Sequence, residues 1–275
     1  AKIAVNESDT LPTPIHLACS KGFEPIVQRL LKLDKSLANA TSDRVLSPLY
    51  YATFDGHTGI VDLLLKAGAD ARRLETPNQM TCLHLACSKR DVPTIEKFLA
   101  KDRALVNVRD GQGFTPLYYA VSDNQESLVD LLLKFKPDVR ITEEERKITP
   151  LHLACSKNLK SIIEKLLKYD KTLINLEADQ DFTPLHVAAV NNQIDAARAL
   201  LKAGADPRRM DSLNKLTPIH LACSKGHTDM VKMFLDHDAS LVQVEDGAGY
   251  TPLHHATNED DSDMIELLFK YISED

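Results

Sequence analysis

The chain has 275 residues and a formal net charge of −7, and its Lys and Arg residues do not gather in a basic block. Duplex nucleic acid binding needs clustered cations, so we do not expect a nucleic acid partner. Spanning a bilayer takes roughly 20 apolar residues in a row; because the sequence has no such run, we expect no membrane insertion.

A ten-residue phrase, Thr-Pro-Ile-His-Leu-Ala-Cys-Ser-Lys-Gly, begins at Thr13 and returns in edited form every 34 residues. Later copies begin at Ser47, Thr81, Thr115, Thr149, Thr183, Thr217 and Thr251. A hydroxyl residue opens every copy, and Pro follows except where Cys82 replaces it. Hydroxyl side chains suit the N-cap and Pro suits the first helical position. The phrase therefore predicts a short helix at the start of each copy.

Nine residues after the opening hydroxyl, most copies carry Gly or Asn, which tolerate the left-handed backbone that ends a helix. Arg90 and Asp260 occupy this position in two copies, so the pattern does not predict how those helices end. A second helix should follow, because apolar pairs recur at i, i+1, i+4 and i+5, as in 26–31. One such pair of helices cannot bury its apolar stripe alone, whereas stacked copies can cover each other.

The phrase Thr-Pro-Leu-His-x-Ala resembles the ankyrin repeat, as do the Gly-His turns at 56–57 and 226–227 and the Leu-Leu-Lys-Ala-Gly-Ala-Asp tails at 64–70 and 200–206. The resemblance implies an all-α ankyrin-repeat solenoid of stacked helix-turn-helix units with β-hairpin fingers. We expect a single domain over residues 1–275, with repeats starting near 8, 42, 76, 110, 144, 178, 212 and 246. The copies are numbered one to eight below.

The repeats also alternate, so the full period is 68 residues. Odd repeats share His-Leu-Ala-Cys-Ser-Lys and end in a segment such as Asp34-Lys35-Ser36-Leu37, whereas even repeats end in a segment such as Gly68-Ala69-Asp70. Two explanations remain open: duplication of a two-repeat ancestor, and a ligand or packing requirement that recurs every two repeats.

Four of the five cysteines occupy one position of the odd repeats: Cys19, Cys87, Cys155 and Cys223. Neighbouring helices pack about 8–10 Å apart, so thiols two repeats apart should be roughly 20 Å from each other. A disulfide needs Cα atoms within about 7 Å. We therefore expect buried thiols in a reducing compartment, the cytoplasm or the nucleus.

Six histidines share one position: His16, His84, His152, His186, His220 and His254. The ankyrin resemblance implies that these imidazoles bond the backbone and the Thr hydroxyl between adjacent repeats. Tyr50 and Tyr118 replace two of them, which a shared catalytic role would not tolerate. The His-x-x-Cys pairs lie two repeats apart, so they cannot supply the four ligands of one zinc site. We expect no enzyme activity, no metal and no cofactor.

One position, which the resemblance places at the end of each inner helix along the concave groove, alternates Lys with acid or amide. Its residues are Lys21, Asp55, Lys89, Asp123, Lys157, Asn191, Lys225 and Glu259. These charges either pair with each other, for at most about 1 kcal/mol a pair, or set the register of a bound partner. Even repeats also carry Arg at the finger base, Arg73 among them, which either grips an acidic partner or forms a solvated edge.

The residue before each opening hydroxyl is apolar, and it is aromatic only at the starts of even repeats. Half-exposed aromatic rings beside a polar rim are typical of binding hot spots, although the same rings could merely pack finger against finger. The candidate apolar anchors are Tyr51, Phe114, Tyr119, Phe182 and Tyr250. The candidate charged contacts are Lys21, Lys89, Lys157, Lys225, Asp55, Asp123 and Arg73.

These features predict a monomeric, non-catalytic scaffold that binds a protein or an extended peptide on its concave finger and inner-helix surface. One alternative is the cytosolic ankyrin portion of a larger channel, kinase or ubiquitin-ligase substrate receptor. A small-molecule sensor is a second alternative, and it would require a concave pocket with a strongly perturbed titratable group.

Overall fold

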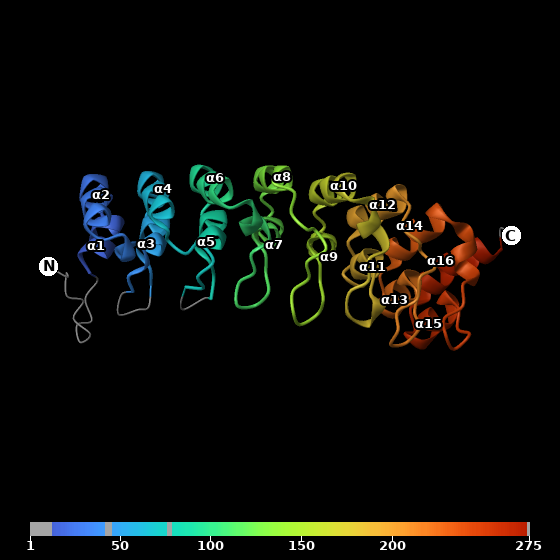
Figure 1. Ribbon diagram of the computed structural model, residues 1–275. Coiled ribbons are helices and arrows are strands. Elements are labelled where there is room, and N and C mark those ends of the chain that lie inside the picture. The colour runs from blue at the N-terminus through green and yellow to red at the C-terminus, as the bar shows by residue number, and fades with distance from the viewer. Residues whose placement is uncertain (1–12, 42–45, 76–78, 274–275) are drawn as a thin grey trace. The chain divides into compact units, whose positions relative to one another are not determined.

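The structure is a computed structural model that describes residues 13–41, 46–75 and 79–273. Its contacts divide the chain into two compact units, Ala1–Asp138 and Val139–Asp275. Each unit consists of short inner helices that alternate with longer outer helices, as Figure 1 shows. The expectation of one domain over residues 1–275 stays a prediction.

In the first unit, inner helices stack on inner helices and outer on outer. The inner helices are α1 (Pro14–Ser20), α3 (Pro48–Phe54), α5 (Cys82–Ser88) and α7 (Pro116–Ser122). The outer helices are α2 (Glu24–Leu33), α4 (Thr58–Ala67), α6 (Val92–Lys101) and α8 (Glu126–Lys134). Two 3₁₀ helices, η1 (Lys35–Asn39) and η2 (Arg103–Asn107), follow α2 and α6.

The second unit repeats this order of elements. Its inner helices are α9 (Pro150–Ser156), α11 (Pro184–Val190), α13 (Pro218–Ser224) and α15 (Pro252–Asn258). Its outer helices are α10 (Lys160–Tyr169), α12 (Ile194–Ala203), α14 (Thr228–His237) and α16 (Ser262–Ile272). Its 3₁₀ helices are η3 (Lys171–Asn175), η4 (Asp179–Asp181) and η5 (Ala239–Gln243).

The predicted helix starts are confirmed. Ser47, Thr115, Thr149 and Thr183 accept a hydrogen bond from the backbone amide three residues later. The helix ends are more uniform than the sequence indicates, because Arg90 and Asp260 adopt positive φ angles of 58° and 54°, close to the 52° of Asn124. Helices α5 and α15 therefore end in the same left-handed turn as the others, at a conformational cost that Gly would not incur.

The fingers that the structure describes are turns rather than strands. Among the described residues, the one β pairing is an isolated antiparallel bridge between Glu75 and Met80. The finger before α7 is closed by a hydrogen bond of 3.0 Å from the Asp110 amide to the Phe114 carbonyl, and the Gly111 amide donates to the Gln79 carbonyl of the preceding finger at 2.8 Å. Where the structure describes them, the expected fingers are thus present, held by a few backbone hydrogen bonds instead of ladders.

The 68-residue period has a structural counterpart in the 3₁₀ helices η1, η2, η3 and η5, which end the odd repeats alone. Asn39, the last residue of η1, donates to the Gly68 carbonyl at 2.9 Å and accepts from the Asp70 amide at 2.8 Å. Asn107 and Asn175 accept the equivalent bond from the amides of Asp138 and Asp206. These bonds tie the first, third and fifth repeats to the even repeat that follows each, so the double period serves packing, whatever its origin.

All five cysteines are buried free thiols. Burial raises the pKa of the Cys19 thiol to about 12, which leaves it protonated and unreactive near neutral pH. Within the described residues, the helices lack the combination of length and hydropathy that crossing a membrane requires.

Candidate functional site

The repeated histidines have the structural role that the sequence predicts. In repeat three, the Thr81 hydroxyl lies 2.8 Å from Nδ1 of His84, and Nε2 of His84 donates to the Phe114 carbonyl at 3.0 Å. His152, His186 and His220 repeat this arrangement with the carbonyls of Phe182, Leu216 and Val244. Each imidazole therefore connects the start of its own helix to the segment that leads into the next repeat.

These bonds require a neutral imidazole. Nδ1 of His84 also accepts from the Thr81 amide at 3.4 Å, so a proton on Nδ1 would face another N–H group. Burial lowers the pKa of His84, His152 and His220 to about 4. A group that is neutral and fully hydrogen-bonded at physiological pH is suited to holding structure and unsuited to proton transfer there.

A buried carboxylate, Asp110, organises the aromatic residues of the first unit. It accepts hydrogen bonds from the Phe114 amide at 2.8 Å, the Gln112 amide at 2.9 Å and the Tyr119 hydroxyl at 2.7 Å. Burial, followed by the contact with Asp110, raises the pKa of Tyr119, so its hydroxyl remains a donor. The Tyr119 ring also meets His84 edge-on at 5.5 Å. The finger and the inner helix are thus locked together around one carboxylate.

The Phe114 ring lies on this locked framework. It stacks on Tyr118 with centroids 4.3 Å apart and meets Tyr119 edge-on at 6.1 Å. The ring is half-buried, so one part packs and the other is accessible to solvent. The structure therefore brings together two of the predicted anchors, Phe114 and Tyr119.

A second aromatic group surrounds Tyr51. Its ring meets His16 edge-on at 5.5 Å and Tyr50 at 6.1 Å, and Tyr50 stacks on Phe54 at 5.9 Å. Phe54 is 47% exposed, and the Lys89 ammonium lies 4.1 Å from its ring centroid. The Lys89 ammonium also donates to the Phe54 carbonyl. Lys89 is thus held over an aromatic face, a cation–π geometry.

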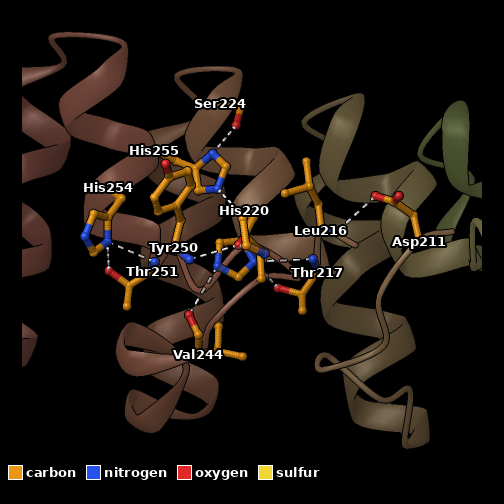
Figure 2. Close-up of polar contacts among 12 residues, drawn as sticks. Asp211, Leu216, Thr217, His220, Ser224, Val244, Tyr250, Thr251, His254 and His255 are labelled. Carbon is orange, nitrogen blue, oxygen red and sulfur yellow. Dashed lines mark hydrogen bonds and ion pairs between the residues drawn. The ribbon is translucent and has the colours of Figure 1, made fainter. Parts of the chain in front are cut away.

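In the second unit, His255 occupies the place of Tyr119. Its Nε2 lies 2.9 Å from Asp246, and its Nδ1 lies 3.0 Å from the Ser224 hydroxyl. Figure 2 shows the His255 ring between Ser224 and Tyr250. The ring centroids of His255 and His220 are 5.1 Å apart. Tyr250, half exposed, stacks on His254 at 5.4 Å. A carboxylate again fixes an aromatic pair at the junction of finger and inner helix.

The line Ser224–His255–Asp246 has the residue types of a hydrolytic triad, but it lacks the accompanying oxyanion site. Acyl transfer needs amide donors directed at the developing oxyanion. The backbone amides that follow Ser224 are already bonded: those of Lys225 and His227 to the Ala222 carbonyl, and that of Gly226 to the Cys223 carbonyl. The chain of hydrogen bonds therefore fixes the last finger, which is a structural role.

The other candidate residues lie apart from these groups. Phe182 meets its own repeat's His186 at 5.4 Å. Asp55 accepts from the Ser20 hydroxyl at 2.7 Å, and Asp123 accepts from the side-chain amide Nε2 of Gln125 at 3.3 Å. Lys21, Lys157 and Lys225 are exposed at the ends of α1, α9 and α13. The Asp55–Ser20 contact joins adjacent repeats, but Ser20 is uncharged, so this contact leaves open whether the alternating charges pair with each other or with a partner.

The arginines at the finger bases are engaged within the chain. Arg72, Arg140 and Arg208 form ion pairs with Asp102, Asp170 and Asp238, at 2.6, 3.3 and 2.8 Å. Each pair joins an even repeat to the odd repeat that follows. Arg73 lies 3.8 Å from the buried carboxylate of Glu75. The arginine row is thus part of the packing that recurs every two repeats.

Sequence reasoning missed Asp110, Asp246 and Phe54. The two aspartates begin the finger segments Asp-Gly-Gln-Gly and Asp-Gly-Ala-Gly, a turn signal that could have identified them. An aromatic residue at the end of an inner helix, as at Phe54, is a weaker signal. In the part of the chain that the structure describes, His, Cys, Asp and Glu do not form a group of three or more that could hold a metal ion.

Comparisons with known proteins agree with the geometry. A sequence model of ankyrin repeats in three copies matches residues 2–75, 49–144, 127–211 and 203–275. The ankyrin repeat domain of Bcl-3, described as a unique member of the IkappaB protein family, is similar in structure with a TM-score of 0.72 and 26% identity, covering 82% of this chain and 100% of that one. The human ASB11 ankyrin repeat domain shares the fold with a TM-score of 0.53 and 22% identity, covering 94% and 98%. The chain belongs to the ankyrin repeat family, whose domains are typical protein–protein interaction modules.

Proposed function

We propose that this chain is a non-catalytic scaffold that binds a protein or an extended peptide on the finger and inner-helix surface of its units. The proposal rests first on its membership of a family of interaction modules. Its second support is that the polar groups with catalytic character, such as His84 and Ser224, are used in hydrogen bonds between repeats.

The observation that carries the proposal is a set of half-exposed rings held in place by hydrogen bonds to the carboxylates of Asp110 and Asp246. Asp110 fixes the backbone of Phe114 and the hydroxyl of Tyr119, and Asp246 fixes the backbone of Tyr250 through a hydrogen bond of 2.9 Å. A partner that contacts such rings does not need to order them, so less conformational entropy is lost on binding. Aromatic residues with these properties are typical of binding hot spots.

Charged residues at the inner-helix ends would set the register of the partner in the first unit. Lys21, Asp55, Lys89 and Asp123 alternate in sign along α1, α3, α5 and α7, and all four are exposed. Lys89 is already oriented by its contacts with Phe54. A partner segment of alternating charge would complement this surface, with specificity arising more from charge placement than from raw affinity.

Site-specific photo-crosslinking in cells tests the proposal. A benzophenone amino acid at position 114 should form a defined adduct with a partner, whereas the same group at Leu33 on α2, 71% exposed, should not. Adding Lys89→Glu and Asp123→Lys should remove the adduct at position 114, because both contacts become repulsive. Equal adducts from both positions, or an adduct at 114 that survives the charge reversal, would overturn the proposed surface.

A further inference from the structure

A cavity of about 360 Å³ lies between the outer helices α12 and α14 of the second unit. Its lining consists of Arg198, Leu201, Lys202, Met233, Asp236 and His237. Leu201 and Met233 are 5% and 7% exposed and form an apolar floor, whereas the four polar residues are exposed around it. The helices belong to the outer row, so this cavity is separate from the inner-helix and finger surface.

The cations at this cavity are not neutralised. Among the residues that the structure describes, Arg198 and Lys202 have no hydrogen-bond or ion-pair partner. The one carboxylate of the lining, Asp236, accepts a hydrogen bond from the Tyr271 hydroxyl. An apolar floor with two unpaired permanent cations at its rim favours a ligand that brings both apolar surface and negative charge.

The chain contains an internal control four repeats earlier, in α4 and α6. There Asp62 stands where α12 has Arg198, and Lys97 stands where α14 has Met233. Asp62 lies 2.6 Å from the Lys66 ammonium and 3.6 Å from that of Lys97, so each of these two cations is paired with a carboxylate. In α12 and α14, the guanidinium of Arg198 stands in place of this carboxylate, and the thioether of Met233 stands in place of the Lys97 ammonium. The cavity is therefore an exception to the repeat pattern.

We propose that the α12–α14 cavity binds an acidic peptide segment in which an aliphatic side chain is flanked by carboxylates. The aliphatic group covers Leu201 and Met233. One carboxylate takes a two-pronged hydrogen bond from Arg198, and another pairs with Lys202. His237 offers a ring N–H at the same rim.

The position of the cavity favours carboxylates over phosphate. Apart from Arg198 at the middle of α12, its lining residues come from the C-terminal halves of α12 and α14, and the backbone groups left unpaired at such helix ends are carbonyls. Phosphate sites use free amides at helix N-termini, which this surface does not offer.

The test is fluorescence anisotropy with a labelled, end-blocked peptide of sequence Glu-Asp-Leu-Asp-Glu and the whole chain. We expect one saturable site whose affinity falls as salt is raised, because exposed charges are screened. Replacing the peptide Leu by Gly should weaken binding about tenfold, a difference of about 1.4 kcal/mol.

The decisive double variant, Arg198→Asp with Met233→Lys, introduces the residues found at the equivalent positions of α4 and α6. It recreates with Lys202 the ion pair that Asp62 makes with Lys66, so the helices should remain folded, as circular dichroism can verify. Binding should weaken by about tenfold or more. The reverse exchange, Asp62→Arg with Lys97→Met, should create a second site and raise the stoichiometry from one to two.

Unchanged affinity after Arg198→Asp with Met233→Lys would overturn the proposal. So would tighter binding of a phosphoserine peptide that lacks the Leu, which would assign the cations to phosphate. Neither outcome bears on the inner-helix and finger surface, because the two surfaces share no residue.

Discussion

The buried histidines predict that the stability of this protein depends on pH well above the range in which its carboxylates titrate. His84, His152 and His220 have an ordinary pKa of 6.5, which burial lowers to about 4 in the folded chain. In the unfolded chain these imidazoles therefore bind protons near pH 6.5, whereas in the folded chain they bind them only near pH 4. Stability is fully present above pH 6.5 and is lost as the pH falls toward 4.

The size of the loss follows from the shift. One pKa unit corresponds to about 1.4 kcal/mol, and pH 5 lies 1.5 units below the unfolded value, so each imidazole costs about 2 kcal/mol at pH 5. His84 belongs to the first unit, whereas His152 and His220 belong to the second. These three imidazoles should therefore lower the free energy of unfolding by about 2 kcal/mol in the first unit and about 4 kcal/mol in the second. His186, whose pKa burial also lowers, adds to the loss in the second unit.

Most carboxylates with a shifted pKa do not affect stability in the pH range in which the histidines act. The pKa values of Asp34, Asp102, Asp170 and Asp238 are lowered below 3.8, chiefly by side-chain hydrogen bonds, so their contribution is lost only in stronger acid. Glu75 acts in the opposite sense, because burial raises its pKa and acid favours its folded form. A comparison between variants of one histidine removes the contribution of Glu75.

The assay is equilibrium urea unfolding at pH 7 and pH 5, followed by circular dichroism. His152→Gln keeps a neutral polar side chain, so the difference between the two pH values should shrink by about 2 kcal/mol relative to the parent chain. His254→Gln is the matched control, because His254 holds the same repeat position but is exposed. An equal pH difference in the parent and in His152→Gln would refute the assignment of neutral, structural imidazoles.

Three further predictions concern stability and use the same urea measurement. Arg90→Gly and Asp260→Gly should each raise the free energy of unfolding by about 0.5 kcal/mol, because both residues have positive φ; a loss of stability would contradict the left-handed helix end. Tyr119→Phe should lower it by about 1–3 kcal/mol, because one oxygen of the buried Asp110 loses its donor; a neutral result would mean that the hydroxyl bonds water instead. Asn39→Ala, which leaves two backbone groups of the next repeat without partners, should cost about 1 kcal/mol. It should cost more than Arg72→Ala, which removes an exposed ion pair; the reverse order would contradict the tie between odd and even repeats.

The repeat architecture is readable from the sequence because every copy carries its own local signals. The opening Thr, the following Pro and the apolar pairs depend on contacts within a few residues or on an identical neighbour. The structural role of the histidines is predictable for the same reason. Tyr50 replaces the histidine in one copy, and a position that accepts this replacement does not require the chemistry of an imidazole. Family and fold are confirmed by the matches along the whole chain.

The surface is harder to predict, because its geometry depends on pairs of residues from different segments. Nothing near Asp110 in the sequence indicates that Tyr119, on the next helix, donates to it. Arg72 pairs with Asp102, which is 30 positions away in the sequence. This pairing shows that the row of arginines at the finger bases takes part in packing, whereas the sequence alone also allowed the row to bind a partner. The lining of the α12–α14 cavity differs from its counterpart in α4 and α6 at Arg198 and Met233, which come from two different helices, so the sequence does not show that they lie together.

The most direct test of the proposed function is hydrogen–deuterium exchange of the chain alone and with the partner that cross-links at position 114. Our account predicts new protection in the first unit at the ends of α3, α5 and α7 and in the finger at 108–114, with exchange in α4 and α6 unchanged. Protection confined to α4 and α6, with the finger and the inner helices unaffected, would contradict it.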